Sequence, residues 1–126
     1  MANRWGAVGA FLMALGVAAG AFAAHALKAR LAPDKLIIFE KAVFYHFIHA
    51  FGILAVAIFC QTSLISGEQS KYVGLIFLSG ILLFSGSLYL YSILETHWLV
   101  FLTPIGGTMF IAGWLLFSYY IWSSGS

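Results

Sequence analysis

The sequence has few charged residues, and this scarcity is its most restrictive feature. Only 8% of the 126 residues are Asp, Glu, Lys or Arg, whereas 63% are hydrophobic. A water-soluble globule needs roughly a quarter of charged residues to cover its surface. The composition therefore excludes an ordinary soluble domain and indicates that the solvent around this chain is lipid.

Basic residues and cysteines are also scarce. Six Lys and Arg against four Asp and Glu leave a formal net charge of +2, far from the basic stripe that nucleic acid requires. We therefore expect no nucleic-acid partner. The single cysteine, Cys60, has no intramolecular disulfide partner and ends an apolar run, so we expect it to pack as a small hydrophobe.

Long apolar runs are what the sequence has instead. A transmembrane helix needs about 20 predominantly apolar residues, and the chain offers four such segments. They are residues 5–24, 42–60, 72–94, and a fourth that covers either 98–122 or 104–122. A chain of this length has room for one domain. We predict an all-α, four-helix transmembrane bundle in which residues 1–126 form a single domain, with membrane lipid around it.

The first apolar segment has two interpretations. Arg4, the apolar middle and the small-residue pattern at residues 21–23 also resemble a cleavable signal peptide. We expect the segment to be retained as a span. Gly16 and Gly20 lie four residues apart and Ala24 continues the row, so this face lets another backbone approach closely. We expect it to pack within the bundle, and a homodimer seam is the alternative.

The second helix is predicted to begin outside the hydrocarbon. Pro33 suits the first turn of a helix, and Asp34 complements the positive helix end. We therefore expect this helix to start near Pro33 at the membrane interface and to enter lipid near Ala42. Residues 61–71 contain Gly, Glu and Ser and are typical of a short exposed loop.

The fourth span contains a break signal, namely Pro104 followed by Gly106 and Gly107. Thr103 is a good N-cap and Pro104 a good first helical residue, so the helix is predicted to begin there after a short interfacial connection. One long helix over residues 98–122 is the alternative.

Polar residues within the spans gather toward one side of the membrane. Depths counted at about 1.5 Å per residue place them in the half of the membrane nearest the first connection, the polar segment at residues 25–41. Because polar groups cost free energy in lipid, they are expected to face the bundle interior. The sequence predicts a one-sided polar pocket formed by His25, Glu40, Tyr45, His49, Ser85, Ser87, Tyr89 and Thr103. The alternative is that these groups only hold the helices together.

The remaining histidines and the serines offer little chemistry. His46 lies on another face of the second helix and is expected to point toward the interface, and His97 is expected in a loop. His46 and His49 have no third strong ligand at matched spacing, so no metal, haem or other cofactor is expected. Ser85 and Ser87 lack a motif that supplies a base and an oxyanion site, so no enzyme activity is expected.

Several motifs resemble one family across nearly the whole chain. They are residues 20–27, Phe39-Glu40, Tyr45, His49-Ala50, the string FSGSLY at 84–89, TPIGG at 103–107, and Gly113-Trp114. The chain resembles domain-of-unknown-function family four-two-three, a group of uncharacterised small bacterial inner-membrane proteins that is similar to a small eukaryotic transmembrane family. The resemblance implies four transmembrane helices in the bacterial inner membrane and no established activity. Phe44 and His46 depart from the family pattern. Of the candidate residues, His46 is therefore the one to which a family role is least readily assigned.

Orientation follows from the basic residues. The first connection carries Lys28, Arg30, Lys35 and Lys41, whereas Arg4 and Lys71 lie on the opposite side. This four-to-two bias predicts a cytoplasmic first connection and extracytoplasmic termini.

The leading functional interpretation is a non-enzymatic binding or accessory component with a polar pocket on one side. The alternative is a small-solute or proton transporter or channel subunit, with Tyr45, His49 and Tyr89 on the path and His25 and Glu40 at its mouth. A path needs polar residues on both sides of the midplane, and the outer half supplies few. Association as a homo-oligomer or with a larger membrane complex is a further expectation.

Overall fold

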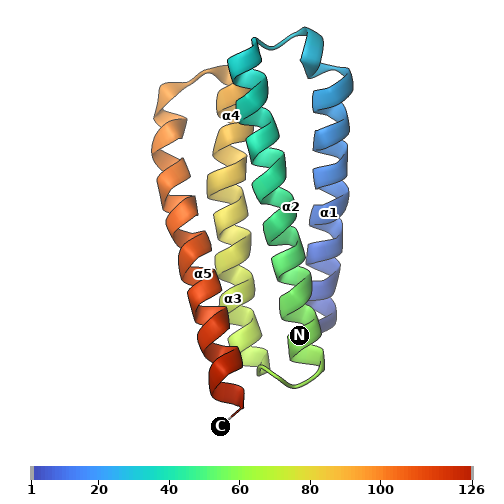
Figure 1. Ribbon diagram of the computed structural model, residues 1–126, viewed down its shortest axis with the longest axis vertical. Coiled ribbons are helices and arrows are strands. Elements are labelled where there is room, and N and C mark those ends of the chain that lie inside the picture. The colour runs from blue at the N-terminus through green and yellow to red at the C-terminus, as the bar shows by residue number, and fades with distance from the viewer. Residues whose placement is uncertain (1, 126) are drawn as a thin grey trace.

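The computed structural model describes residues 2–125, which form helices without any strand (Figure 1). The main elements are α1 (Ala2–His25), α2 (Pro33–Gln61), α3 (Gly67–Gly80), α4 (Gly86–Leu94) and α5 (Leu102–Ser124). Short helical turns η1 (Leu27–Ala29) and η3 (His97–Phe101) lie in two connections, and η2 (Ile81–Ser85) joins α3 to α4. Within the described range, four stretches are long and apolar enough to cross a membrane. The predicted all-α bundle with four spans is confirmed.

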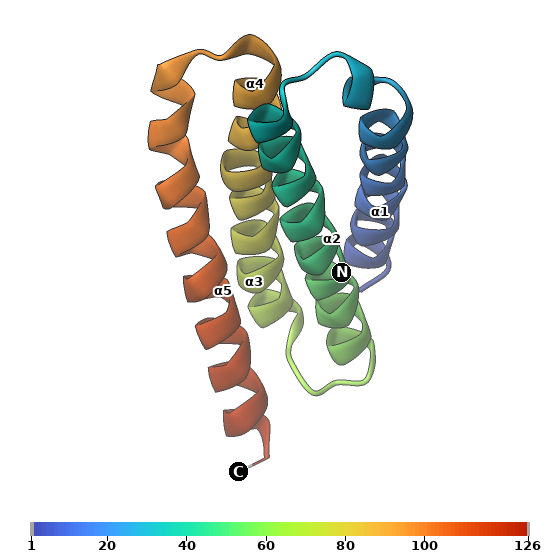
Figure 2. The ribbon, with the colours of Figure 1, turned by 45° about the horizontal axis from the view of Figure 1, so that its top comes forward.

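The helices run up and down with short connections (Figures 1 and 2). α1 packs along α2, and α2 packs along the continuous α3–η2–α4 rod. α5 packs on the other side of that rod, mainly against α3 and η2. Both ends of the chain lie at the end of the bundle that carries the α2–α3 loop (Figure 1).

Local sequence signals set several helix ends. Pro33 occupies the first turn of α2 and Asp34 follows it, as predicted. Ser66 and Gln69 form a capping box that starts α3 at Gly67, so the connection after α2 is shorter than the predicted 61–71 loop. Glu95 ends α4 in the left-handed conformation with φ 56°.

The predicted N-cap of the last helix is wrong. α5 begins at Leu102, and Phe101 occupies the cap position without a side-chain hydrogen bond. Thr103 lies inside the first turn instead, where its Oγ1 is 2.6 Å from the hydroxyl of Ser87 on α4. In lipid the cross-helix hydroxyl bond satisfies both side chains, and the preceding η3 turn supplies the interfacial break that the sequence predicted.

A π-helical turn interrupts the third span. In η2 the N–H of Gly86 donates to the carbonyl of Ile81, five residues earlier, so this turn holds one residue more than an α-helical turn. The buried hydroxyl of Ser85, at the end of η2, donates to the carbonyl of Ala42 on α2 at 2.8 Å. The π-helical turn therefore ties the third span to the second.

Glycines permit several close helix approaches, among them one between α1 and α2 and one between α5 and η2. Between α1 and α2, a Cβ placed on Gly16 would lie 2.7 Å from the ring of Phe47. Between α5 and η2, a Cβ on Gly106 would lie 2.3 Å from the backbone nitrogen of Phe84. In the second approach a Cβ on Gly106 would meet backbone atoms of Phe84, so no rotation of a side chain can relieve the overlap.

The predicted small-residue row of α1 faces α2 over part of its length. Gly16 is buried, and a Cβ on Gly20 would be 3.6 Å from Val43. Ala24 is exposed at the edge of a small cleft between α1 and α2.

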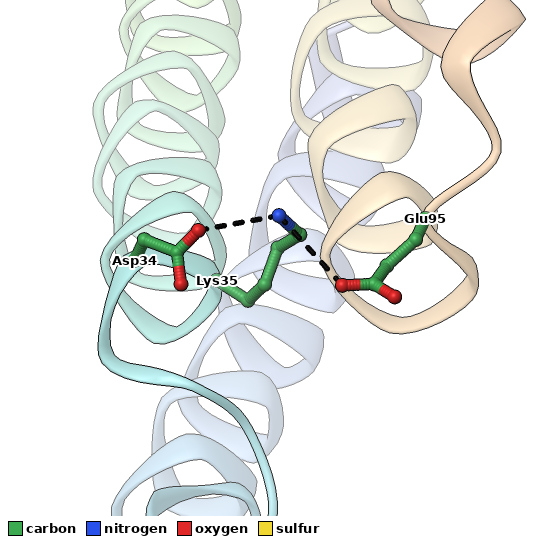
Figure 3. Close-up of polar contacts among 3 residues, drawn as sticks. All are labelled: Asp34, Lys35 and Glu95. Atoms are coloured by element: carbon green, nitrogen blue, oxygen red, sulfur yellow. Dashed lines mark hydrogen bonds and ion pairs between the residues drawn. The ribbon is translucent and has the colours of Figure 1, made fainter.

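The end of the bundle with the first connection is held by an ionic clasp (Figure 3). The Nζ of Lys35 at the start of α2 lies 3.3 Å from Asp34 and 3.7 Å from Glu95 at the end of α4. The same ammonium group is 5.3 Å from the ring centre of Tyr91. Because the carboxylates are exposed, we treat the clasp as orienting the two helix ends rather than as a main source of stability.

The closest backbone approach gives a stability prediction. Gly106→Ala should destabilise the folded protein by about 1–3 kcal/mol, because the new methyl group overlaps the backbone of Phe84. Gly107→Ala is the matched control, since its Cβ meets the Phe84 ring at 3.6 Å, an ordinary contact. Thermal unfolding in detergent should show a lower Tm for Gly106→Ala alone. Equal Tm values for both variants would contradict the packing assignment.

Candidate functional site

His46 joins three helices inside the membrane. Its Nε2 lies 2.7 Å from the carbonyl oxygen of Leu12 on α1, and its Nδ1 lies 2.8 Å from the hydroxyl of Tyr89 on α4. A carbonyl only accepts, so Nε2 carries the hydrogen and the Tyr89 hydroxyl donates to Nδ1. The residue is only 5% exposed. His46 is thus a fully bonded neutral imidazole that links α1, α2 and α4.

His49 makes a second cross-helix connection with the opposite tautomer. Its Nδ1–H donates to the carbonyl of Tyr45 at 2.8 Å, and its Nε2 accepts from the indole N–H of Trp114 on α5 at 3.0 Å. Its ring stacks on Phe110, with centroids 3.4 Å apart. Indole is only a donor, so a proton on His49 Nε2 would face another hydrogen.

Serine hydroxyls in this half of the bundle are also satisfied. Ser87 donates to the carbonyl of Phe84 at 2.8 Å, so the 2.6 Å contact with Thr103 has the threonine hydroxyl as donor. Ser92 donates to the carbonyl of Tyr89, and Ser85 donates to Ala42. The Ser85 and Ser87 hydroxyls connect neighbouring helices, whereas the Ser92 bond stays within α4.

A groove opens between α2 and α5 where the two helices diverge. Its central cleft has a volume of about 430 Å³ and is lined by Tyr45, Ile48, His49, Phe84, Gly107, Phe110, Ile111 and Trp114. A second cleft of about 390 Å³ shares Phe84 and Gly107 and continues toward the first connection past Ile38, Leu88, Tyr91, Val100, Thr103 and Pro104. A third of about 480 Å³ shares Trp114 and continues toward the C-terminus along Phe59 and Phe117. We call the three together the α2–α5 groove.

One polar group in the central cleft makes no hydrogen bond within the described residues. The ring of Tyr45 lies 4.8 Å from Phe84 and 6.5 Å from Phe110, measured between centroids. Among the described residues, its hydroxyl makes no hydrogen bond, although the side chain is half-buried and lines the central cleft. The central cleft therefore presents an apolar, aromatic wall with one hydroxyl available to an occupant.

The predicted pocket residues fall into separate groups. Tyr45, His49 and Thr103 line the groove, whereas Tyr89 binds His46 toward α1. Ser85 is covered by α2, and Ser87 and Thr103 bond each other between α4 and α5. Glu40 lies in a cleft of about 180 Å³ between α1 and α2, and His25 is exposed at the end of α1. The eight residues share one half of the bundle, but α2 separates them instead of gathering them around a single cavity.

The prediction for His46 is wrong, since it points into the bundle and not toward the interface. Its position follows the buried face of α2, which carries Phe39, Ala42, Ala50 and Ile53 at helical spacing. That periodicity was the available signal for its burial. Trp114 was also missed as a site residue, because nothing in its local sequence indicates that its indole reaches a histidine 65 positions away.

The arrangement offers no preformed metal site among residues 2–125. No group of three His, Cys, Asp or Glu side chains lies close enough to hold an ion. Both nitrogens of His46 and of His49 are engaged in hydrogen bonds.

The two tautomers can be measured directly. In protein labelled with nitrogen-15 histidine, His46 should carry its hydrogen on Nε2 and His49 on Nδ1, because each faces a carbonyl with that nitrogen. Magnetic-resonance spectra in lipid would assign each ring nitrogen, with exposed His97 as the reference. Finding the same tautomer for His46 and His49 would contradict the hydrogen-bond assignment.

The His46–Tyr89 bond should contribute a measurable coupling energy. A double-mutant cycle with His46→Ala and Tyr89→Phe should give about 0.6–1.7 kcal/mol, the range seen for hydrogen bonds within membranes. Unfolding free energies in detergent provide the readout. Tyr45→Phe with His46→Ala is the matched control and should be additive, because Tyr45 and His46 share no hydrogen bond. A coupling near zero for Tyr89 would refute the interaction.

Comparison with known proteins places this chain in a family. The family model described as "Protein of unknown function (DUF423)" matches residues 19–107, more than half of the chain. This match includes α2, α3, η2 and α4, together with the start of α5. No solved structure gives a significant match.

Relatives from several bacteria align over most of their length. A UPF0382 membrane protein of Staphylococcus saprophyticus is 38% identical over 109 residues, covering 86% of this chain and 88% of the relative. The UPF0382 membrane protein YwdK of Bacillus subtilis is 39% identical over 111 residues, covering 86% and 88%. The UPF0382 inner membrane protein YgdD of Escherichia coli is 35% identical over 101 residues, covering 79% and 75%. The family resemblance is confirmed, and the chain belongs to the DUF423 family of membrane proteins of unknown function.

Proposed function

We propose that this chain is a non-enzymatic binding protein of the membrane, acting as an accessory component, and that its α2–α5 groove holds the apolar part of an amphiphilic ligand. The observation that carries the proposal is the central cleft. Its volume of about 430 Å³ lies in the range of small-molecule sites, which are mostly apolar and carry few polar groups.

The construction of the groove supports a binding role. Phe84 and Gly107 belong to both the central cleft and the cleft nearest the first connection, so the two clefts adjoin at these residues. The hydrogen bond from Trp114 to His49 fixes the distance between α2 and α5 at the far end of the central cleft. A cleft with fixed walls binds with less loss of conformational entropy than one that must form around its ligand.

The transporter interpretation receives less support from the same geometry. The hydrogen-bonded imidazoles and hydroxyls of the pocket region lie in one half of the bundle. Toward the other end the core is apolar, with Ile53, Val56, Val73 and Phe77 almost completely buried. A proton or solute path would have to cross that layer, and the paired groups would have to exchange their partners.

For the location we propose the bacterial inner membrane, with the first connection in the cytoplasm and both termini outside it. The relative from Escherichia coli is described as an inner membrane protein. The first connection holds four of the six basic residues. Labelling of single cysteines introduced at residues 30 and 124 from either side of sealed vesicles would test the orientation.

Filling the groove should abolish binding without disturbing the fold. Gly107→Leu places a side chain into the space between Phe84 and α2, so ligand retained through purification should fall by at least about tenfold. Native mass spectrometry of protein extracted gently from its own membrane measures the retained mass. Ala112→Leu, which adds the same side chain to an exposed position outside the groove lining, should retain the wild-type amount.

The outcomes separate binding from other roles. Equal retention by both leucine variants, or a wild-type protein that carries no ligand in its own membrane extract, would overturn the proposed function. Unfolding temperatures of the two variants establish that a loss of ligand does not come from a loss of fold.

A further inference from the structure

We infer that the occupant of the α2–α5 groove is an anionic glycerophospholipid, bound with its phosphate at Lys41 and an ester carbonyl at Tyr45. One acyl chain then runs over Phe84 and Gly107 toward Trp114. This inference rests on the proposed function and adds the ligand class and its direction in the groove.

The register of α2 places a cation beside the groove, between residues that line the central cleft and the cleft nearest the first connection. Ile38, Tyr45 and Ile48 line the clefts, and Lys41 lies between them at helical spacing, three residues after Ile38 and four before Tyr45. Lys41 is exposed and makes no ion pair among the described residues, in contrast to Lys35. Its ammonium group is therefore available to a phosphate.

The unpartnered hydroxyl of Tyr45 lies one turn deeper. Four residues of helix correspond to about 6 Å along the axis, comparable with the offset between a phosphate and the ester carbonyls of a glycerophospholipid. A phenol hydroxyl that finds no acceptor in an apolar medium is unfavourable, and an ester carbonyl is an acceptor at this depth. The lipid itself supplies the partner that the described part of the chain does not.

Charge favours an anionic over a zwitterionic headgroup at this end of the bundle. Lys28, Arg30 and Lys41 are exposed there. The two acids closest to the mouth, Asp34 and Glu95, are engaged with Lys35 (Figure 3), and Glu40 lies in the separate cleft between α1 and α2. Each basic residue near a membrane surface is worth about fivefold in affinity for anionic lipid.

Below the mouth the groove fits a hydrocarbon chain. Phe84 and Gly107 form a continuous floor between two clefts, and the wall continues through Phe110 to Trp114. The polar atoms of His49 and Trp114 are bonded to each other and need nothing from the occupant. As far as Trp114, the groove thus offers the Tyr45 hydroxyl, unbonded within the described residues, and apolar contact beneath it, which is the pattern of a phospholipid.

Two near-isosteric variants test the two polar contacts separately. The protein is placed in nanodiscs of equimolar phosphatidylglycerol and phosphatidylethanolamine, and native mass spectrometry counts the lipids retained on the released protein. Lys41→Gln should lower the preference of wild type for phosphatidylglycerol by about fivefold. Tyr45→Phe should lower retention of both lipids by about fivefold, because both carry the ester carbonyl, and should leave the preference unchanged.

Matched controls remove the same groups elsewhere. Lys71→Gln and Tyr119→Phe change exposed residues outside the groove and should behave as wild type. Test variants indistinguishable from these controls would overturn the inference. So would a lipid retained without headgroup preference, or a second chain cross-linked into the groove. If Gly107→Leu still removes the bound mass in those cases, the proposed function stands while the phospholipid assignment falls; if it does not, both fall.

Discussion

The constraint on which this structure depends is that the hydrocarbon core of the membrane neither donates nor accepts hydrogen bonds. Every imidazole and hydroxyl within the spans therefore needs a partner on another turn or another helix. His46 reaches Leu12 and Tyr89, His49 reaches Trp114, and Ser85 reaches Ala42. All four helical spans are connected through these few bonds, and each bond runs to or from α2. The second helix is thus the element through which these hydrogen bonds connect the other three spans.

Close packing sets where the bundle is closed and where it is open. Gly106 lets α5 approach the π-helical turn η2 until its backbone meets that of Phe84. α5 is consequently held against the third span, and it meets α2 through side chains, including the His49–Trp114 hydrogen bond and the stacking of His49 on Phe110. The α2–α5 groove is the result of this geometry, since a helix drawn toward one neighbour leaves space beside the next.

These two features assign different roles to residues that look alike in the sequence. His46, His49, Ser85 and Ser87 make their hydrogen bonds within the chain, and these bonds connect the helices. The proposed binding surface consists mainly of aromatic rings and the glycine at residue 107, and the hydroxyl of Tyr45 is the available polar group of its central cleft. In a family without an established activity, the groove is therefore a better guide to function than the polar residues of the spans.

The sequence by itself determined the class of the protein. Four uncharged runs of membrane length, Pro33 at a helix start and the basic first connection are local properties, and hydrophobicity and helix geometry act on them directly. Depth along a span also follows from counting, so the gathering of polar residues in one half was predictable. Only the tertiary structure decided which of those residues meet. The rotation of each helix about its axis depends on its packing against the other helices. The burial of His46, the bond from Trp114 to His49 and the separation of the expected pocket by α2 are therefore set only when the four spans assemble.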